Sequence, residues 1–176
     1  MFRIITVALG VAVLTTLPGD RWPKGYKGEP PAARVDRVDI VDKGIYRAEV
    51  LEIIPDPHSP TGTRERIGNI TLQQDTTSIP RIKNSRFGLR YSITGVPSGG
   101  QVALKIIVIY PEGGPRSHRT GTAGDRDEFP LVQLIGSGPY YWGFRMDDDT
   151  ALGVWDFQVW VDQRMLAEQT FNIVRP

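Results

Sequence analysis

GVWDFQVWVDQRMLAEQTFNIVRP, residues 153–176, is the stretch that decides the fold. Four apolar residues recur at every second position: Trp155, Phe157, Val159 and Val161. The positions between them and after them carry Asp156, Gln158, Trp160 and Asp162. A helix would need its apolar residues three or four positions apart, so this alternation predicts a β-strand with one buried face.

A second strand follows at once and closes the chain. Ala167, Phe171 and Ile173 share its apolar face, and residues 162–164 are the only polar break between the two runs. The break lacks the glycine that tight primed turns prefer, which predicts a longer or bulged connection. The two runs therefore form an antiparallel hairpin.

Further short runs upstream are typical of strands separated by turns. The predicted strands are residues 35–41 and 45–54, 67–76, 87–94, 102–110, 129–135 and 140–146. Lys43 and Gly44 are predicted to form a bulge or kink within one long edge strand, and the segment 78–86 with Pro80 is predicted to be a loop. Residues 102–110 are apolar on both faces, which predicts a central strand. About eight strands without a helix predict an all-β, two-sheet antiparallel sandwich with Trp155 in its core.

The closing hairpin also carries a resemblance to known proteins. Its pattern consists of Gly153, Trp155, Phe157, Val159, Asp162, Leu166, Glu168, Phe171 and either Ile173 or Val174. This pattern resembles the last two strands of many bacterial immunoglobulin-like domains. Together with FGLRY at 87–91 and GIY at 44–46, the chain resembles an uncharacterised bacterial family known only as a domain of unknown function, over roughly residues 35–174. The resemblance implies an immunoglobulin-like β-sandwich and no catalytic residues.

The N-terminal residues 1–19 are predicted to be a signal peptide. Arg3 precedes an apolar run from Ile4 to Leu17, which is shorter than the roughly 20 residues of a membrane span. An uncleaved anchor and a buried N-terminal helix are the alternatives. Residues 20–33, rich in Pro, Gly and Lys, are predicted to be a linker to a domain at 34–176. We therefore expect a periplasmic or secreted protein with no membrane span after signal removal.

Composition argues against several classes of function. The chain has 21 basic and 20 acidic residues, so nothing in its charge favours a nucleic-acid partner. It has no cysteine, which excludes disulfides, thiolate zinc sites and a cysteine nucleophile. No sequence motif for a cofactor or for hydrolysis occurs. Asp147, Asp148 and Asp149 lack the ligand pattern of a calcium loop and are predicted to be solvated turn residues.

Two sets of residues are candidates for binding. Trp160 and Tyr141 each lie on the face opposite a core aromatic, so they could stack on a sugar or on a partner side chain, or be covered by a second apolar layer. Arg116, His118 and Arg119 lie in the long glycine-rich loop 111–127. Two basic clusters, at residues 81–90 and 116–126, are predicted to be solvated loop residues and not anion-binding sites.

These observations favour an exported, non-enzymatic β-sandwich that binds a protein or envelope component. The first alternative is a carbohydrate-binding module that uses Trp160 and Tyr141, with a glycan partner in the envelope. The second is a hydrolase with its site in the 111–127 loop. The sequence does not fix the oligomeric state or the identity of the partner.

Overall fold

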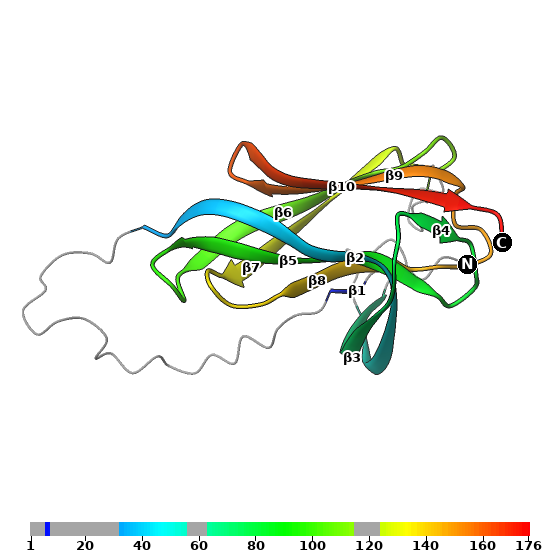
Figure 1. The fold of residues 1–176 in the computed structure, drawn as a ribbon, viewed down its shortest axis with the longest axis horizontal. Helices are drawn as coiled ribbons and strands as arrows, with labels where there is room; N and C mark the ends of the chain where they lie inside the picture. Colours follow the sequence, from blue (N-terminus) through cyan, green and yellow to red (C-terminus); the bar gives the residue numbers. More distant parts are fainter. Residues whose placement is uncertain (1–5, 8–31, 56–62, 115–123) are drawn as a thin grey trace, which may run out of the picture.

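The computed structural model describes residues 6–7, 32–55, 63–114 and 124–176. Nine strands form two facing sheets in these ranges, and no helix occurs in them (Figure 1). They are β2 (Arg34–Pro55), β3 (Thr63–Asp75), β4 (Ser78–Pro80), β5 (Arg86–Val96), β6 (Gln101–Ile109), β7 (Arg126–Leu134), β8 (Tyr140–Arg145), β9 (Gly153–Val161) and β10 (Arg164–Val174). This confirms the predicted all-β sandwich.

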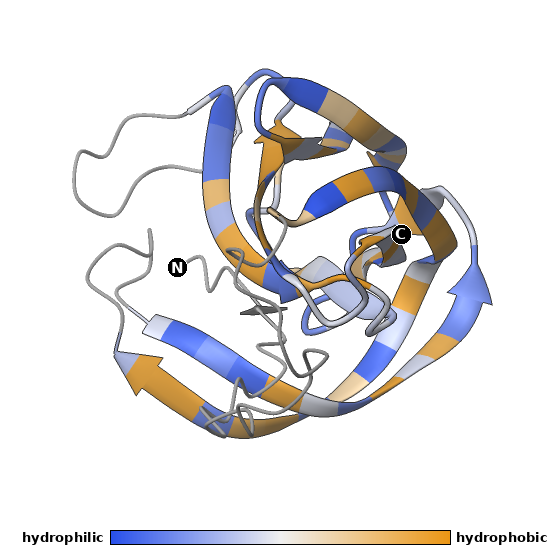
Figure 2. Cartoon of the chain, turned by 90° about the vertical axis from the view of Figure 1, so that its left-hand side faces the viewer, coloured by the Kyte–Doolittle hydropathy of each residue, from blue (hydrophilic) through white to orange (hydrophobic). Residues whose placement is uncertain are grey.

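The first sheet has the strand order β3-β2-β5-β8, and the second has the order β4-β10-β9-β6-β7. A further strand, β1 (Thr6–Val7), pairs with both β3 and β8 and so joins the two edges of the first sheet. All neighbours within the second sheet are antiparallel except β4 and β10, which run parallel. Figure 2 shows that the first sheet is strongly curved where β2 and β3 continue beyond the two facing layers.

The main core lies between the sheets and is built from the alternating faces that the sequence predicts. Phe87 of β5 is fully buried and packs edge-on against Trp155 and Phe171 of the second sheet, at ring-centroid distances of 5.6 and 5.5 Å. Trp155 is 2% exposed, as predicted. The predicted central strand is confirmed too, because β6 lies between β7 and β9 with Ile106, Ile107 and Val108 all buried.

Three local predictions need correction. β2 is one continuous strand that is paired on one side only over most of its length, as expected, but at residues 44–46 it lies between β3 and β5 and is not an edge there. The segment predicted as a loop contains β4, because Ile79 inserts into the core beside Ile173 of β10. The final turn has only two residues, since Asp162 takes the positive φ of 53° that a glycine would otherwise supply. A bulge does follow it, between Met165 and Ala167.

The signal peptide and linker predictions fall mainly on residues outside the described ranges. Of residues 1–33, the structure describes the backbone of β1 and residues 32–33. No helix in the described part of the chain is long and apolar enough to cross a membrane.

Candidate functional site

β2 and β3 extend beyond the sandwich as a two-stranded arm, which we define as residues 47–55 of β2 and 63–73 of β3. The pairing of β2 with β5 ends at Tyr46 and Arg86, whereas its pairing with β3 continues to Pro55 and Thr63. The arm therefore leaves the sandwich as a hairpin that is visible below the two layers in Figure 1. Register shifts along the hairpin, such as the one that makes Leu51 an extra residue, bend it across the outward face of the first sheet.

A second apolar cluster holds the arm against the sheet. Tyr46, Ile67 and Tyr141 are its buried members. The rings of Tyr46 and Tyr141 meet edge to face with centroids 4.9 Å apart. Tyr141 fits because Gly143 has no side chain, and a Cβ there would overlap the Tyr141 hydroxyl and the Phe87 carbonyl. The arm is therefore packed on a small core of its own.

Buried ion pairs flank this cluster at one end. Glu65 of the arm accepts a 2.6 Å hydrogen bond from Arg86 Nη2 and lies 3.3 Å from Arg145 Nη1. Glu65 and Arg86 are 7% and 4% exposed. Two arginines that face each other across β5 and β8 thus share one carboxylate supplied by β3. Because buried charges are costly when they lose their partner, this triad fixes the position of the arm.

Asp42 makes a similar contact on the other side of the cluster. Arg90 Nε lies 2.9 Å from each Asp42 carboxylate oxygen, and the Tyr46 hydroxyl donates to the same group. The hydrogen bond from Arg90 holds the pKa of Asp42 below its ordinary value. Burial, together with the Asp42 charge, raises the pKa of Tyr46. Tyr46 is therefore a neutral donor to an ionised carboxylate at neutral pH.

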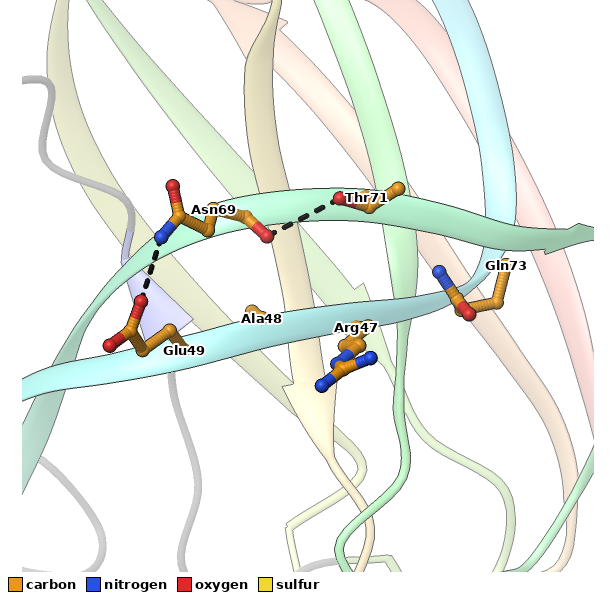
Figure 3. A pocket seen from close by; sticks show the side chains of 6 residues that line it. All are labelled: Arg47, Ala48, Glu49, Asn69, Thr71 and Gln73. Atoms are coloured by element: carbon orange, nitrogen blue, oxygen red, sulfur yellow. Dashed lines mark hydrogen bonds between the residues drawn. The ribbon is translucent and has the colours of Figure 1, made fainter.

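The opposite face of the arm forms a polar hollow of about 610 Å³. Its lining residues are Arg47, Ala48, Glu49, Asn69, Thr71 and Gln73. Figure 3 shows the Glu49 and Asn69 side chains together at one end and those of Arg47 and Gln73 toward the other. Asn69 Nδ2 donates to Glu49 Oε2 at 2.7 Å, so Asn69 bridges the two strands. Among the described residues, no tyrosine, tryptophan or phenylalanine lines the hollow.

The residues that line the hollow offer mainly polar contacts. The Thr71 hydroxyl donates to the Asn69 backbone carbonyl, at 3.4 Å, and not to a base that would activate it. Arg47 is exposed and makes no hydrogen bond or ion pair with the other described residues. Arg47 and Glu49 thus offer one positive and one negative group on the surface of the arm.

The predicted binding residues do not come together. Tyr141 is 4% exposed and belongs to the second apolar cluster. This agrees with the predicted alternative in which a second apolar layer covers Tyr141. Trp160 is half-buried on the outward face of β9 in the other sheet, where its Nε1 donates to Gln158 at 3.0 Å. A surface that combines these two aromatics therefore does not exist. Arg116, His118 and Arg119 lie outside the described residues.

The basic cluster at residues 81–90 is dispersed among acidic partners. Arg86 and Arg90 take part in the buried and half-buried pairs described above, and Lys83 pairs with Asp148. Asp147 lies in a turn in which its backbone N–H donates to the Thr150 hydroxyl at 2.9 Å and its carboxylate accepts from the Asp148 N–H at 3.0 Å. Within the described ranges, no three His, Cys, Asp or Glu residues are grouped in a way that could hold a metal ion.

Sequence reasoning missed the arm, although one signal was present. Residues 50–54 read VLEII, an apolar run at the end of a strand, and Val50, Leu51 and Ile53 are 41%, 50% and 51% exposed. The sequence pattern predicts a long strand at 45–54 that includes this run, but it does not predict that the strand leaves the sandwich. The prolines that follow it, at 55, 57 and 60, indicate the tip of a hairpin.

Comparisons with known proteins agree with the fold. No curated protein matches the chain. An immunoglobulin-like protein from Pseudomonas aeruginosa of known crystal structure is similar to it, with a TM-score of 0.51, 21% identity, and coverage of 84% of this chain and 100% of that one. At this identity the likeness concerns the fold alone. The model of the family described as domain of unknown function DUF3859 matches residues 34–173, and the chain accordingly belongs to this family.

Proposed function

We propose that this chain is an exported, non-enzymatic binding module whose arm contacts a protein of the cell envelope. The N-terminal apolar run after Arg3 supports export, and the immunoglobulin-like sandwich is an architecture that often carries recognition surfaces. The contact surface in this proposal is the polar hollow on the outward side of the arm.

The observation that carries the proposal is the way the arm is held. A projecting hairpin with few contacts would be mobile, yet this one has its own apolar cluster and a buried Arg86–Glu65–Arg145 triad. A surface that is ordered before it binds loses less conformational entropy on association. The arm thus presents Glu49 and Asn69, which are hydrogen-bonded to each other, in a fixed arrangement to a partner, with the exposed Arg47 beside them.

The hollow favours a protein partner over a glycan. Sugar rings are commonly recognised by stacking on aromatic side chains, and none of the six described residues that line the hollow is aromatic. Its guanidinium, carboxylate, amide and hydroxyl groups suit the mixed polar side chains and backbone groups of a protein surface. One positive and one negative charge in the hollow also suit a partner region without strong net charge.

Site-specific photocrosslinking tests this proposal in cells that produce the protein. A photoreactive amino acid at Thr71, in the hollow, should give one discrete adduct in the envelope fraction. The same amino acid at Thr94, which is exposed on β5 away from the arm, is the matched control and should give none. If both positions give the same adducts, or if Thr71 gives none, the arm is not the contact surface.

A further inference from the structure

The arm has a second feature that the proposed function does not use, which is the free edge of β2. Over residues 34–46 this strand has β5 on one side, but the pairing stops at Tyr46 opposite Arg86. Residues 47–55 pair with β3 on one side only, and no described strand occupies the other side. Their outward N–H and C=O groups are thus available to another strand.

Two other edges in the described part of the chain are protected. β7 has Pro130 near its middle, and β4 is a three-residue strand that ends in Pro80. Proline and short length are common protections against edge-to-edge pairing. The free edge of β2 has no proline before Pro55, and three of its residues, Val50, Leu51 and Ile53, are large, apolar and at least two-fifths exposed.

The two carboxylates on this edge form contacts with the neighbouring strand β3. Glu49 Oε2 accepts from Asn69 and Glu52 Oε2 accepts from Arg66, both on the neighbouring strand β3. The carboxylates that would repel an incoming strand are therefore engaged on the far side of β2. This leaves the apolar side chains of Val50 and Ile53 as the main side-chain contacts that the edge can offer.

We infer that the free edge of β2 pairs with the same edge of a second copy of this chain. In an antiparallel arrangement with the two-fold axis between Leu51 and Glu52, Val50 of each copy lies opposite Ile53 of the other. Glu49 then faces Ile54 and Glu52 faces Leu51, so no two like charges are directly opposed. Such a pairing is self-complementary and closes after two copies, which is the commonest symmetry of homo-oligomers. A short ribbon of this kind gives a weak, reversible dimer.

Sedimentation of the full chain over a range of concentrations tests the inference. The wild-type chain should pass from monomer to dimer, and Val50→Lys with Ile53→Lys should weaken this self-association by at least about tenfold. Both residues are exposed, so the variant should keep the circular dichroism and unfolding midpoint of the parent. The matched control is Val132→Lys with Val154→Lys, two exposed positions on the second sheet, which should leave the dimer unchanged.

The absence of cysteine from the chain allows a second, geometric test. The variant Val50→Cys with Ile53→Cys should form disulfide-linked dimers under mild oxidation, because opposed residues in an antiparallel pair lie within disulfide distance. The control Val132→Cys with Val154→Cys should stay monomeric under the same conditions. A chain that sediments as a monomer at every concentration, a dimer that survives the paired lysines, or equal crosslinking in both cysteine variants would overturn the inference.

Discussion

Tyr141 and Trp160 sit on the outward faces of the two sheets, yet they occupy opposite environments. The outward face of the first sheet is covered by its own continuation, since the arm folds over Tyr141 and buries the ion pairs beside it. The outward face of the second sheet is open: Trp160 is half-buried there among Gln158 and the exposed Lys105–Glu128 pair. The same alternation of side chains in β8 and β9 thus leads to a second apolar core on the outward face of the first sheet and to a partly solvated surface on the outward face of the second.

The difference originates in the length of β2. A strand that ended at Tyr46, together with a β3 of matching length, would leave Tyr141 exposed in the way that Trp160 is. Because β2 continues to Pro55 and bends at its bulges, the first sheet folds onto itself. Substitutions on the outward face of the first sheet should therefore behave as core substitutions, and those on the second sheet as surface substitutions.

The largest expected effect is on Tyr141. Tyr141→Ala should lower the free energy of unfolding by about 3–4 kcal/mol, because it leaves a cavity among Tyr46, Ile67 and the sheet. Trp160→Ala on the open face should cost about 1 kcal/mol despite the larger side chain, because much of it already contacts water. Urea denaturation of both variants measures the difference.

The conservative substitution Tyr141→Phe serves as the control for this pair. The Tyr141 hydroxyl makes only a 3.4 Å contact with the Phe87 carbonyl, so its loss should cost less than about 1 kcal/mol. Equal losses for Tyr141→Ala and Trp160→Ala would mean that the second apolar cluster does not contribute to stability as a core.

Glu65 gives the next largest effect. Glu65→Gln removes the buried carboxylate shared by Arg86 and Arg145 and should destabilise the fold by about 3 kcal/mol. Glu128→Gln breaks exposed contacts with Lys105 and Arg126 on the second sheet and should change the stability far less than Glu65→Gln. Thermal unfolding in low and high salt distinguishes the two, because salt should screen the exposed pair and not the buried one.

A destabilisation by Glu65→Gln no greater than that by Glu128→Gln would contradict the buried role of the triad. Hydrogen exchange in the arm adds a readout that is specific to position. If Glu65 fixes the arm, the amides of β3 should exchange faster in Glu65→Gln than those of β9.

The contrast between the sheets also explains which features could be predicted from sequence. Alternation is a local signal, so it identified β9 and β10 and placed Trp155 in the core. The same alternation correctly put Tyr141 opposite Trp142, but it carries no information on what covers that opposite face. Tyr141 is covered by Ile67 and Tyr46, which are distant from it in sequence.

The arm was harder to predict for a related reason. Leu51 is an extra residue at a bulge, so it shifts the apolar positions of β2 by one and hides the point where the strand leaves the sandwich. Ion pairs such as Glu65 with Arg86 depend on this long-range bend. The hollow could not be predicted either, because Arg47 and Thr71 become neighbours only through the register of β2 and β3.

Asp42 and Asp156 extend the comparison to pH, because the two sheets shift these carboxyl groups in opposite directions. The hydrogen bond from Arg90 lowers the pKa of Asp42 in the folded state. The ionised Asp42 therefore stabilises the fold fully at pH values above the pKa of this group in the unfolded chain. This stabilisation is lost as the pH falls through the lowered pKa of the folded state. Asp42→Asn should therefore cost about 2 kcal/mol at pH 7. The difference in free energy of unfolding between wild type and Asp42→Asn should shrink below about pH 4. Urea denaturation from pH 7 to pH 3 measures it, and a gap that does not change with pH would contradict the ionised pairing with Arg90.

The smallest effect, with the opposite sign, is expected at Asp156 on the open face. Burial raises the pKa of Asp156, and the nearby Glu168 carboxylate adds to the increase, so the folded state favours the protonated acid. Stability is then lost as pH rises from the unfolded pKa through the raised value. Asp156→Asn should remove this loss and stabilise the chain by about 0.5 kcal/mol at pH 7, the size of one like-charge cross-strand contact.

Near pH 3.5 the gain from Asp156→Asn should vanish, because the acid is then largely protonated in both states. Asn at this position can still accept from Gln158 through its Oδ1, while its Nδ2 can donate to the Thr170 hydroxyl oxygen, so the substitution removes the charge and allows both local contacts. Denaturation at pH 3.5 and pH 7 separates the two carboxyl groups: Asp42→Asn should destabilise and Asp156→Asn stabilise at pH 7, with both differences shrinking in acid. If Asp156→Asn destabilises at pH 7, then Asp156 is a structural anion like Asp42, and the two outward faces differ in exposure but not in electrostatics.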